Sequence, residues 1–479
     1  MLLRWLTSPA ASTSKFSLPR TIRQLLERPP SADDATTVFG WIKSIRKQKN
    51  MSFAVITDGS SANGLQAVLL KGKDDDLFKK LTNGAAVRLT GRLVSSPGAG
   101  QSHELLVDQT GQVAILGECD PEAYPIQKKD LTSEYLRDHI HLRARTAHIA
   151  AMIRLRDSLS RQINSWFDSQ GFYFVNTPII TGNDAEGAGE AFRLALLEMQ
   201  HPAAATTTPP TPSEFFSRPS FLTVSHQLHL EALATAISRV YTISPCFRAE
   251  RSLTGRHLAE FWMVEAEWAF PQNGVHGVCD LTEALLRSTV NEVLTSEDMD
   301  ILWKEGSSAR HQILLDAFTT QKPWTKISYT EAVHELEAAG SVQFEYKPKW
   351  GHSLQSEHEK WLAEQLVRGP VFVTDYPTSL KPFYMRANED AQTVACFDLL
   401  VPHVGELIGG SMREERADLL KRQMAGIGGS EWYVDLRKYG GAPHAGFGMG
   451  FERLVSWVSG IENVRECTPM PRWAGRMLL

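Results

Sequence analysis

Three separate segments of this chain carry charged and aromatic residues at spacings that could bind a nucleotide. The first consists of 247–250 (FRAE) and 256–261 (RHLAEF), which together contain Arg248, Glu250, His257 and Phe261. Two strands joined by such a loop can present a guanidinium to phosphate, a carboxylate to an amine and an aromatic ring to a base. A strand pair with surface ion pairs has the same pattern, so this segment alone does not decide its chemistry.

The second segment is a pair of acids that could hold a hard cation. Asp398 and Glu406 lie eight residues apart, with Pro402 and Gly405 between them. This spacing predicts neighbouring strands of a hairpin whose carboxylates converge, and converging carboxylates are suitable ligands for Mg²⁺. The alternative is a hairpin with two solvated surface acids.

The third segment is rich in glycine and ends at an arginine. In 440–455 (GGAPHAGFGMGFERLV), Gly450 precedes a predicted helix whose first turn contains Arg453. Glycines at the end of a strand leave room for a ligand, and the positive end of a helix favours phosphate. A glycine-rich run alone carries little information, but its position after the other two segments carries more.

The elements that must position these segments can be predicted from hydrophobic periodicity. Apolar residues at helical spacing over 150–170 predict a helix that Gly171 ends, and strands are predicted at 172–175 and 262–267. The other predicted elements are a mainly helical stretch at about 274–365, strands at 371–374, 393–400 and 408–412, and a helix after Gly450. The stretch 201–213 (HPAAATTTPPTPS) is of low complexity and predicts a surface loop.

The N-terminal part of the chain predicts a small β-barrel. Residues from about 36 to 118 alternate with period two in five short strands, with a helix after the third. This is the order of an OB-like barrel, whose exposed face can bind single-stranded nucleic acid by stacking bases on aromatic rings. Phe53, next to a basic run that contains Arg46 and Lys47, is a candidate platform. The alternatives are that Phe53 is a core residue and that the basic run is a solvated surface.

The first 26 residues resemble a mitochondrial presequence. They contain four basic residues together with several Ser and Thr, and the first acid is Glu27. A disordered N-terminal tail is the alternative. A polar, proline-containing segment at 119–145 predicts a hinge between the barrel and the remainder of the chain.

Size and composition limit the class of protein. A chain of 479 residues is long enough for two or three domains of roughly 150 residues each. Its 42% hydrophobic residues contain no apolar run near the ~18 residues that a membrane span requires, so we expect no membrane segment. The net charge of −5 means that RNA contacts would have to come from local basic patches. Five widely separated cysteines without a CxxC pair predict reduced thiols rather than a zinc site.

The three segments, in this order, resemble the motifs of class II aminoacyl-tRNA synthetases. The first is similar to motif 2 and the third to motif 3, with the acid-bearing strands between them, and the 150–170 helix with Thr177-Pro178 is similar to motif 1. The subgroup with an N-terminal OB barrel contains the aspartate, asparagine and lysine enzymes. Within it, 256–265 and 405–417 (GELIGGSMREERA) are most similar to asparaginyl-tRNA synthetases. The resemblance runs from about residue 36 to the C-terminus.

The resemblance implies an α+β fold with two domains. A five-stranded OB-fold β-barrel at 36–118 would bind the anticodon, and a class II antiparallel β-sheet flanked by helices would occupy 146–479. The implied reaction is ATP-dependent attachment of L-asparagine to tRNA(Asn) through an asparaginyl-adenylate, in a homodimer formed through motif 1. With the presequence, the expected location is the mitochondrial matrix.

Roles for the nucleotide-binding residues can be carried over from this family. Arg248 is expected to hold the α-phosphate of ATP and the amino-acid carboxylate, while Phe261 stacks on adenine and Glu250 binds near it. The resemblance also implies that His257 and Arg453 bind the outer phosphates and that Gly450 forms part of the wall of the ATP site. Asp398 and Glu406 are expected to hold Mg²⁺. No side chain acts as a nucleophile, because the substrate carboxylate attacks the α-phosphorus itself.

The resemblance also implies an amino-acid pocket. Glu186 is expected to pair with the α-ammonium, with Gln227 as its polar partner, and Arg413 is expected to grip the side-chain oxygen. Aspartate enzymes of the subgroup carry a lysine three residues after the glutamine, where this chain has Leu230. Without that charge the pocket disfavours aspartate, and Glu265 could accept a hydrogen bond from the asparagine amide.

Two departures from the family pattern affect the shape of this pocket. His226 replaces a small residue, and 193–195 (RLA) replaces a Val-Thr-Thr-like strand. Three alternatives therefore stay open: an aspartyl enzyme, including one that charges both tRNAs; an inactive RNA-binding paralogue; and an asparagine-forming enzyme that does not use tRNA. Intact Arg248, Glu406 and Arg453 argue against the second alternative, and the predicted barrel argues against the third.

Overall fold

The computed structural model describes residues 18–70, 75–98, 100–108, 112–182, 191–195, 215–252, 254–304, 308–340, 342–425 and 431–479. Within it, the chain forms two compact units, Met1–Ala150 and Ala151–Leu479. The low-complexity stretch 201–213 and Glu186 both lie outside the described residues.

The first unit contains a closed β-barrel. Its strands pair in the order β1-β2-β3-β5-β4, and β4 also pairs with β1, which closes the barrel. β5 and β6 both pair with β4, so the last of the five predicted strands is in fact two strands that share one neighbour. The elements are β1 (Ala35–Lys47), β2 (Met51–Thr57), β3 (Leu65–Leu70), α2 (Asp75–Lys80), β4 (Ala86–Ser95), β5 (His103–Val107) and β6 (Val113–Gly117).

A short helix, α1 (Ile22–Glu27), belongs to this barrel. Ile22 and Leu25 are 1% and 2% exposed and pack into the barrel core. The main-chain N–H of Ile22 also donates to Asp58 at 2.8 Å. A presequence that extended to residue 26 would therefore include part of the barrel core. A presequence compatible with this fold ends before the helix begins.

The segment predicted as a hinge contains short helices. These are α3 (Ser133–Asp138), which Thr132 caps through its side chain, and the 3₁₀ turn η2 (Arg143–Arg145). Both belong to the first compact unit.

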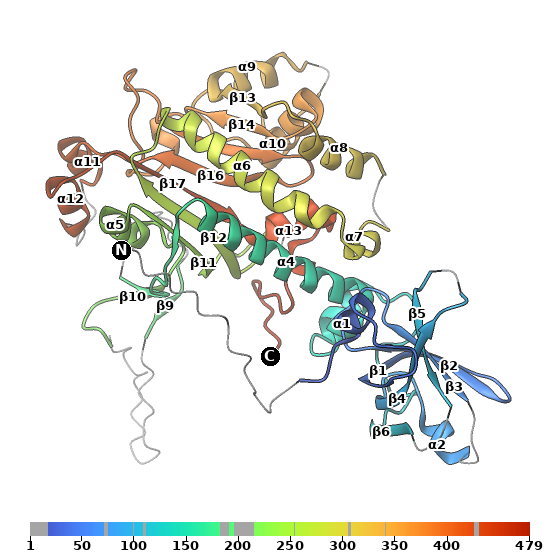
Figure 1. The fold of residues 1–479 in the computed structure, drawn as a ribbon. Coiled ribbons are helices and arrows are strands. Elements are labelled where there is room, and N and C mark those ends of the chain that lie inside the picture. Colours follow the sequence, from blue (N-terminus) through green and yellow to red (C-terminus); the bar gives the residue numbers. More distant parts are fainter. Residues whose placement is uncertain are drawn as a thin grey trace, which may run out of the picture. The chain divides into compact units, whose positions relative to one another are not determined.

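The second unit is built on an eight-stranded sheet (Figure 1). The strand order is β13-β14-β15-β16-β17-β12-β11-β7, antiparallel from β14 to β11 and parallel at both edge pairs. The strands are β7 (Tyr173–Phe174), β11 (Arg239–Phe247), β12 (Glu260–Ala269), β13 (Thr325–Ser328), β14 (Val371–Thr374), β15 (Cys396–Val401), β16 (Gly405–Met412) and β17 (His444–Gly450).

Helices pack against this sheet. The ring of Phe167 in α4 stacks on Tyr241 of β11 with 4.2 Å between centroids, and α6 lies across β15, β16 and β17 (Figure 1). Gly171, with φ of +73°, follows the end of α4 as predicted. The longer helices are α4 (Ala147–Ser169), α5 (Gln227–Ile237), α6 (Gly274–Leu294), α8 (Ser308–Thr319), α9 (Tyr329–Ala338) and α13 (Phe451–Ser459). The shorter ones are α7 (Glu297–Leu302), α10 (Ser356–Trp361), α11 (Ala417–Gln423) and α12 (Glu431–Lys438).

The stretch at about 274–365 is mainly helical, as predicted, but it also contains β13. This strand has only four residues, too few for a period-two pattern to show, and its parallel pairing with β14 defines it. A separate small sheet pairs β10 (Ser220–Leu222) with β8 (Ile180–Thr181) and β9 (Arg193–Leu194). None of the five cysteines, all of which lie within the described residues, forms a disulfide bond. Among the described residues, no helix is long and apolar enough to cross a membrane.

Candidate active site

One strand, β12, carries side chains into two adjoining pockets. Side chains on a strand alternate between faces, so Phe261, Met263, Glu265 and Glu267 point to the same side. Phe261 lies in the first pocket, Glu265 and Glu267 lie in the second, and Met263 lines both. The residues common to the two pockets are Arg248, Met263, Glu406 and Gly448. One elongated ligand could therefore occupy both pockets.

The first pocket gathers every residue that the sequence predicted to bind ATP. They come from the connection between β11 and β12, from β12 itself, from β16 and from the start of α13. Among the residues that line the pocket are Arg248, Glu250, His257, Phe261, Glu406, Gly450 and Arg453. Segments far apart in the chain thus meet at one cavity.

Arg248 stands at the junction of the two pockets. It follows β11 directly, and its main-chain N–H donates to the carbonyl of Ala259 at 3.0 Å. Its guanidinium carbon lies 5.5 Å from the ring centroid of Phe261, and Nη1 lies 3.9 Å from Oε1 of Glu250. The side chain is about one-third exposed, so its charge can reach a ligand in either pocket.

His257 is held in its neutral form. Desolvation lowers the pKa of His257, Glu250 raises it, and the charges of Arg453 and Arg256 lower it further. Nε2 lies 3.2 Å from Oε2 of Glu250, and Nδ1 lies 2.6 Å from Oγ1 of Thr254. A neutral imidazole has a single N–H, and here that N–H lies on Nε2 and faces Glu250, so His257 can donate to a phosphate only by exchanging this partner.

Arg453 and Glu406 form the far side of the same pocket. Nη1 of Arg453 donates to the main-chain oxygen of Glu406 at 2.8 Å and lies 3.5 Å from its Oε2. As predicted, Gly450 caps α13, and Arg453 sits in the first turn, where the helix dipole is positive. Desolvation would raise the pKa of Glu406, but the charges of Arg453, Lys381 and Arg248 lower it. Glu406 is therefore an ionised carboxylate.

Asp398 lies close to Glu406 but is already paired. A Cβ added at Gly409 would lie 3.4 Å from Oε1 of Glu406 and 3.6 Å from Oδ1 of Asp398, so the two acids converge as predicted. Nζ of Lys381, however, donates to both oxygens of Asp398 at 2.8 and 2.7 Å. Mg²⁺ is often bound by one or two carboxylates together with substrate phosphates. The donor set fits such an ion, with Glu406 as the open ligand and Asp398 as a ligand only after Lys381 moves.

The second pocket contains the predicted amino-acid contacts that the structure describes. Gln227, Glu265 and Arg413 all line it, as does Leu230, which stands where aspartate enzymes carry a lysine. Nε and Nη2 of Arg413 donate to Glu267 at 3.1 and 2.8 Å. The guanidinium is therefore fixed in place before any substrate enters.

Glycines of β17 make room for this arrangement. A Cβ at Gly446 would lie 1.9 Å from Oε2 of Glu267 and 2.5 Å from Nη2 of Arg413. A Cβ at Gly448 would lie 2.7 Å from Cε of Met263. At these two positions glycine makes room for side chains of the site, whereas room for a ligand stays a prediction.

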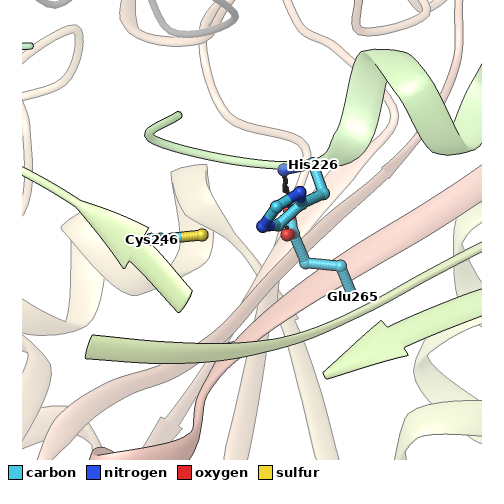
Figure 2. A group of neighbouring side chains, drawn as sticks. All are labelled: His226, Cys246 and Glu265. Atoms are coloured by element: carbon cyan, nitrogen blue, oxygen red, sulfur yellow. Dashed lines mark hydrogen bonds between the residues drawn. The ribbon is translucent and has the colours of Figure 1, made fainter. Parts of the chain in front are cut away.

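Glu265 ties the start of α5 to β12. Its Oε2 accepts the main-chain N–H of His226 at 2.9 Å, and Figure 2 shows the carboxylate beneath this residue. The ring of His226 bonds elsewhere: Nδ1 lies 2.6 Å from Oγ1 of Thr177, and Nε2 lies 3.1 Å from a main-chain carbonyl. His226 is not among the residues that line the second pocket, and where it lies beside Cys246 and Glu265 both of its ring nitrogens already have hydrogen-bond partners.

The barrel holds the residues predicted to contact the anticodon. Phe53 on β2 pairs in register with Arg46 on β1, whose guanidinium carbon lies 5.1 Å from the ring centroid. Ser52 and Ala54 are buried on either side, whereas Phe53 is only half-buried, so the alternative that Phe53 is a core residue is wrong. Nζ of Lys47 donates to the carbonyl of Lys79 at 3.1 Å.

Comparison with known proteins decides the family. Residues 132–474 match the class II tRNA synthetases (D, K and N), and residues 36–113 match the OB-fold nucleic acid binding domain. The asparagine–tRNA ligase of Rhodopirellula baltica is 45% identical over 480 residues, which cover 98% of this chain and 93% of the relative. The chain belongs to the class II asparagine–tRNA ligases. The ligase of a Nostoc species is 44% identical, with 95% of this chain and 98% of the relative covered.

Solved structures of this ligase family share the fold. The asparaginyl-tRNA synthetase of Pyrococcus horikoshii complexed with asparaginyl-adenylate is 28% identical with a TM-score of 0.82, and the match covers 97% of this chain and all of that chain. The Entamoeba histolytica enzyme with asparaginyl-adenylate is 25% identical with a TM-score of 0.79, covering 95% and 98% of the two chains. The predicted α+β fold, with an OB barrel and a class II sheet domain, is confirmed.

Sequence reasoning missed several charged residues around the ligase pockets. Glu359 of α10 accepts the main-chain N–H of Glu406 at 3.2 Å and lies 3.3 Å from Arg256. Neither Glu359 nor Lys381 stands in a motif, so no signal pointed to them. Glu231 could have been found, because it lies four residues after Gln227 and therefore on the same face of a helix.

Proposed function

We propose that this ligase forms asparaginyl-adenylate across its two joined pockets and transfers the asparaginyl group to tRNA(Asn) in mitochondrial translation. The observation that carries this proposal is the sharing of Arg248 and Glu406 by the nucleotide pocket and the amino-acid pocket. A mixed anhydride of an amino acid and a nucleotide has its two halves on either side of one phosphorus atom. The guanidinium of Arg248, which lines both pockets, is placed to contact the phosphate between the two halves.

In the adenylate-forming step, Arg248 orients the substrate carboxylate toward the α-phosphorus and offsets charge on the phosphate oxygens. Phe261 stacks on adenine beside this guanidinium, and Glu250, which lines the same pocket, accepts a hydrogen bond from the base. His257 and Arg453 bind the outer phosphates. The chain contributes position and countercharge, so the pathway requires no covalent enzyme intermediate.

Mg²⁺ fits beside Glu406 in this scheme. When bound there, it would neutralise phosphate oxygens and so ease displacement of pyrophosphate. Glu406 would hold the ion, and Asp398 of the same hairpin would support it if Lys381 moved away. Gly409, without a side chain, leaves the space between the two carboxylates open.

The amino-acid pocket suits an amide side chain. Arg413 can donate to the side-chain oxygen with the N–H groups that Glu267 does not take. Glu265 already accepts hydrogen bonds from Ser225 and His226, but a carboxylate has roughly four acceptor positions, so one can receive the amide NH₂. Leu230 adds no cation for a carboxylate. Glu186 is proposed to bind the α-ammonium together with Gln227.

A homodimer is part of this proposal. Next to the helix that resembles motif 1, the edge strand β7 and the segment after it expose apolar side chains: Tyr173 by 64%, Phe174 by 47% and Ile180 by 46%. Such a patch at a sheet edge favours burial by a second copy. Sedimentation is expected to give a dimer, and only monomer-sized species at micromolar concentration would contradict it.

The mitochondrial location rests on the N-terminal segment. No acid precedes Glu27, and the folded barrel begins at α1. We therefore propose a cleavable presequence that ends before Arg20. Residues 1–19 fused to a fluorescent protein should direct it to mitochondria, and a cytosolic distribution would contradict this assignment.

One experiment tests the activity directly. The purified chain is assayed for ATP–pyrophosphate exchange with asparagine and with aspartate, and then for charging of mitochondrial tRNA. Exchange that depends on asparagine, with charging of tRNA(Asn), is expected. Equal exchange with both amino acids would indicate a non-discriminating enzyme, and no exchange with either would indicate an inactive RNA-binding protein.

A further inference from the structure

A buried acid, Glu231, lies under the amino-acid pocket without any motif to account for it. It is fully buried, and both of its carboxylate oxygens accept hydrogen bonds. Its donors are Nε2 of Gln227 at 3.0 Å, the hydroxyl of Tyr433 at 2.7 Å, Nη2 of Arg437 at 2.8 Å and Nε2 of His444 at 3.0 Å. A carboxylate with four donors is strongly held in its ionised form. Although desolvation opposes it, the charge of Arg437 and the hydrogen bond of His444 lower the pKa of Glu231.

His444 carries a positive charge in this cluster. Its Nδ1 lies 2.8 Å from the carbonyl of Ala442 and its Nε2 lies 3.0 Å from Oε2 of Glu231. Both partners are acceptors, so both ring nitrogens must donate, which requires the doubly protonated imidazolium. Desolvation lowers the pKa of His444, but the hydrogen bond and charge of Glu231 outweigh it and raise the pKa overall.

Arg413, the residue placed to grip the substrate side chain, has its charge compensated by acids of the protein. Glu267 receives hydrogen bonds from it on both oxygens, and Oε1 of Glu231 lies 3.8 Å from its Nε. Burial raises the pKa of Glu267 and the charge of Arg413 opposes that rise. Because the geometry is that of a two-point guanidinium–carboxylate contact, the pair is ionised.

The charges around the end of the pocket therefore cancel. Among the described residues, Glu265, Glu267 and Arg413 line this end of the pocket, and Glu231, Arg437 and His444 lie behind Arg413; together they contribute three carboxylates and three cations. A neutral amide leaves this balance unchanged. A substrate carboxylate would add an uncompensated negative charge in a buried place, which is strongly unfavourable.

We propose that Glu231 is a specificity-determining residue, whose buried charge balances the cations beneath Arg413 so that the pocket accepts asparagine and rejects aspartate. This inference rests on the proposed function and adds a residue that does not itself line the pocket. It also explains why an acid stands four residues after Gln227. The acid holds Gln227 by a hydrogen bond and sets the electrostatic balance at the same time.

The test compares variants that change this balance in opposite directions. E231Q removes one negative charge and keeps the shape of the side chain. R437Q removes the positive charge of Arg437, the ion-pair partner of Glu231. For each variant, kcat/KM is measured for asparagine and aspartate in ATP–pyrophosphate exchange. Where turnover of aspartate is below detection, its inhibition constant against asparagine is used.

The two single variants are expected to shift the aspartate-to-asparagine ratio of kcat/KM in opposite directions. E231Q should raise the aspartate-to-asparagine ratio by about tenfold or more, R437Q should lower it, and the double variant E231Q/R437Q should return it to within about threefold of the wild-type value. A matched control is E283Q, which neutralises a buried acid in α6 that is paired with Arg287 and lies outside both pockets. It should leave the ratio unchanged.

A purely structural role for Glu231 predicts a different pattern. Activity with both amino acids would then fall together in E231Q and R437Q, and the double variant would be worse than either; that pattern would overturn the proposal. If E231Q does not fold, R437Q still decides, because an unchanged or increased affinity for aspartate contradicts the charge balance. Absence of asparagine-dependent exchange in the wild-type chain would instead reject the proposed function itself.

Discussion

In the catalytic unit, the residues that line the two pockets come from places as distant as Gln227 and Arg453, whereas in the barrel the three predicted RNA contacts all lie between Arg46 and Phe53. The pocket residues are fixed by ion pairs and hydrogen bonds to one another. The barrel residues stand on two neighbouring strands, and their main constraint is the contact of Arg46 with the ring of Phe53.

This difference reflects the kind of ligand that each surface has to bind. Adenylate formation moves charge at one phosphorus atom, so fixed countercharges lower the barrier without having to reorganise. Single-stranded RNA is flexible, and stacking on an exposed ring tolerates small displacements. Substitutions in the pockets should therefore act on amino-acid activation, and substitutions on the barrel should act on tRNA charging alone.

The largest expected effect is that of Arg248→Ala. The guanidinium serves both pockets, and loss of a fixed donor to a developing negative charge typically costs roughly 10²–10³ in kcat. Asparagine-dependent pyrophosphate exchange should fall by about that factor. The matched control is Arg239→Ala, at the other end of β11 and outside both pockets. A loss of less than about threefold in R248A would remove Arg248 from its central role.

Glu406→Gln should have the next largest effect on pyrophosphate exchange. The size of this effect should depend on the concentration of Mg²⁺. With one open carboxylate lost, we expect the Mg²⁺ concentration for half-maximal exchange to rise about tenfold or more. Binding of Mn²⁺ in the presence of ATP, followed by electron paramagnetic resonance, provides a reading independent of activity. The control is Glu364→Gln, an acid that pairs with His403 outside the pockets. An unaltered metal requirement in E406Q would count against this ligand.

Phe53→Ala tests the other side of the comparison. A stacked base contributes roughly 1–3 kcal/mol, so KM for tRNA should rise by about tenfold while exchange without tRNA is unchanged. Leu116→Ala, which truncates an exposed apolar side chain on β6, serves as the control. Normal charging by F53A would show that the barrel binds RNA through another face.

Lys47→Ala should have the smallest effect. Its ammonium already donates to the carbonyl of Lys79, so it is only partly available to phosphate. We expect KM for tRNA to rise by about two- to threefold. The slope of log KM against log salt concentration should decrease by the amount that corresponds to about one phosphate contact. A tenfold rise in KM for tRNA would mean that the basic residues of the barrel are held in place as firmly as the residues of the pockets.

The sequence predicted the parts of the site that stand in motifs. Arg248, Phe261, Glu406 and Arg453 meet at one cavity because each lies at the end of a strand or the start of a helix, and such positions can be recognised from local patterns. Glu359 and Lys381 could not be predicted, because their proximity to Glu406 and Asp398 depends on how distant elements pack.

Two further differences between the predicted and the observed fold also have physical causes. The four-residue strand β13 is too short for its alternation to be recognised, and its pairing with β14 is a tertiary contact. The composition of helix α1 fits a presequence as well as it fits a folded segment. Only the burial of Ile22 and Leu25 in the barrel core shows that this helix belongs to the fold.

The most direct test of two joined pockets is a crystal structure with a non-hydrolysable sulfamoyl analogue of asparaginyl-adenylate. The adenine should stack on Phe261, the sulfamoyl group should lie against Arg248, and the amide should reach Arg413 and Glu265. An analogue bound with its two halves in any other pair of positions, or with Arg248 turned away from the linkage, would contradict a single site spanning both pockets.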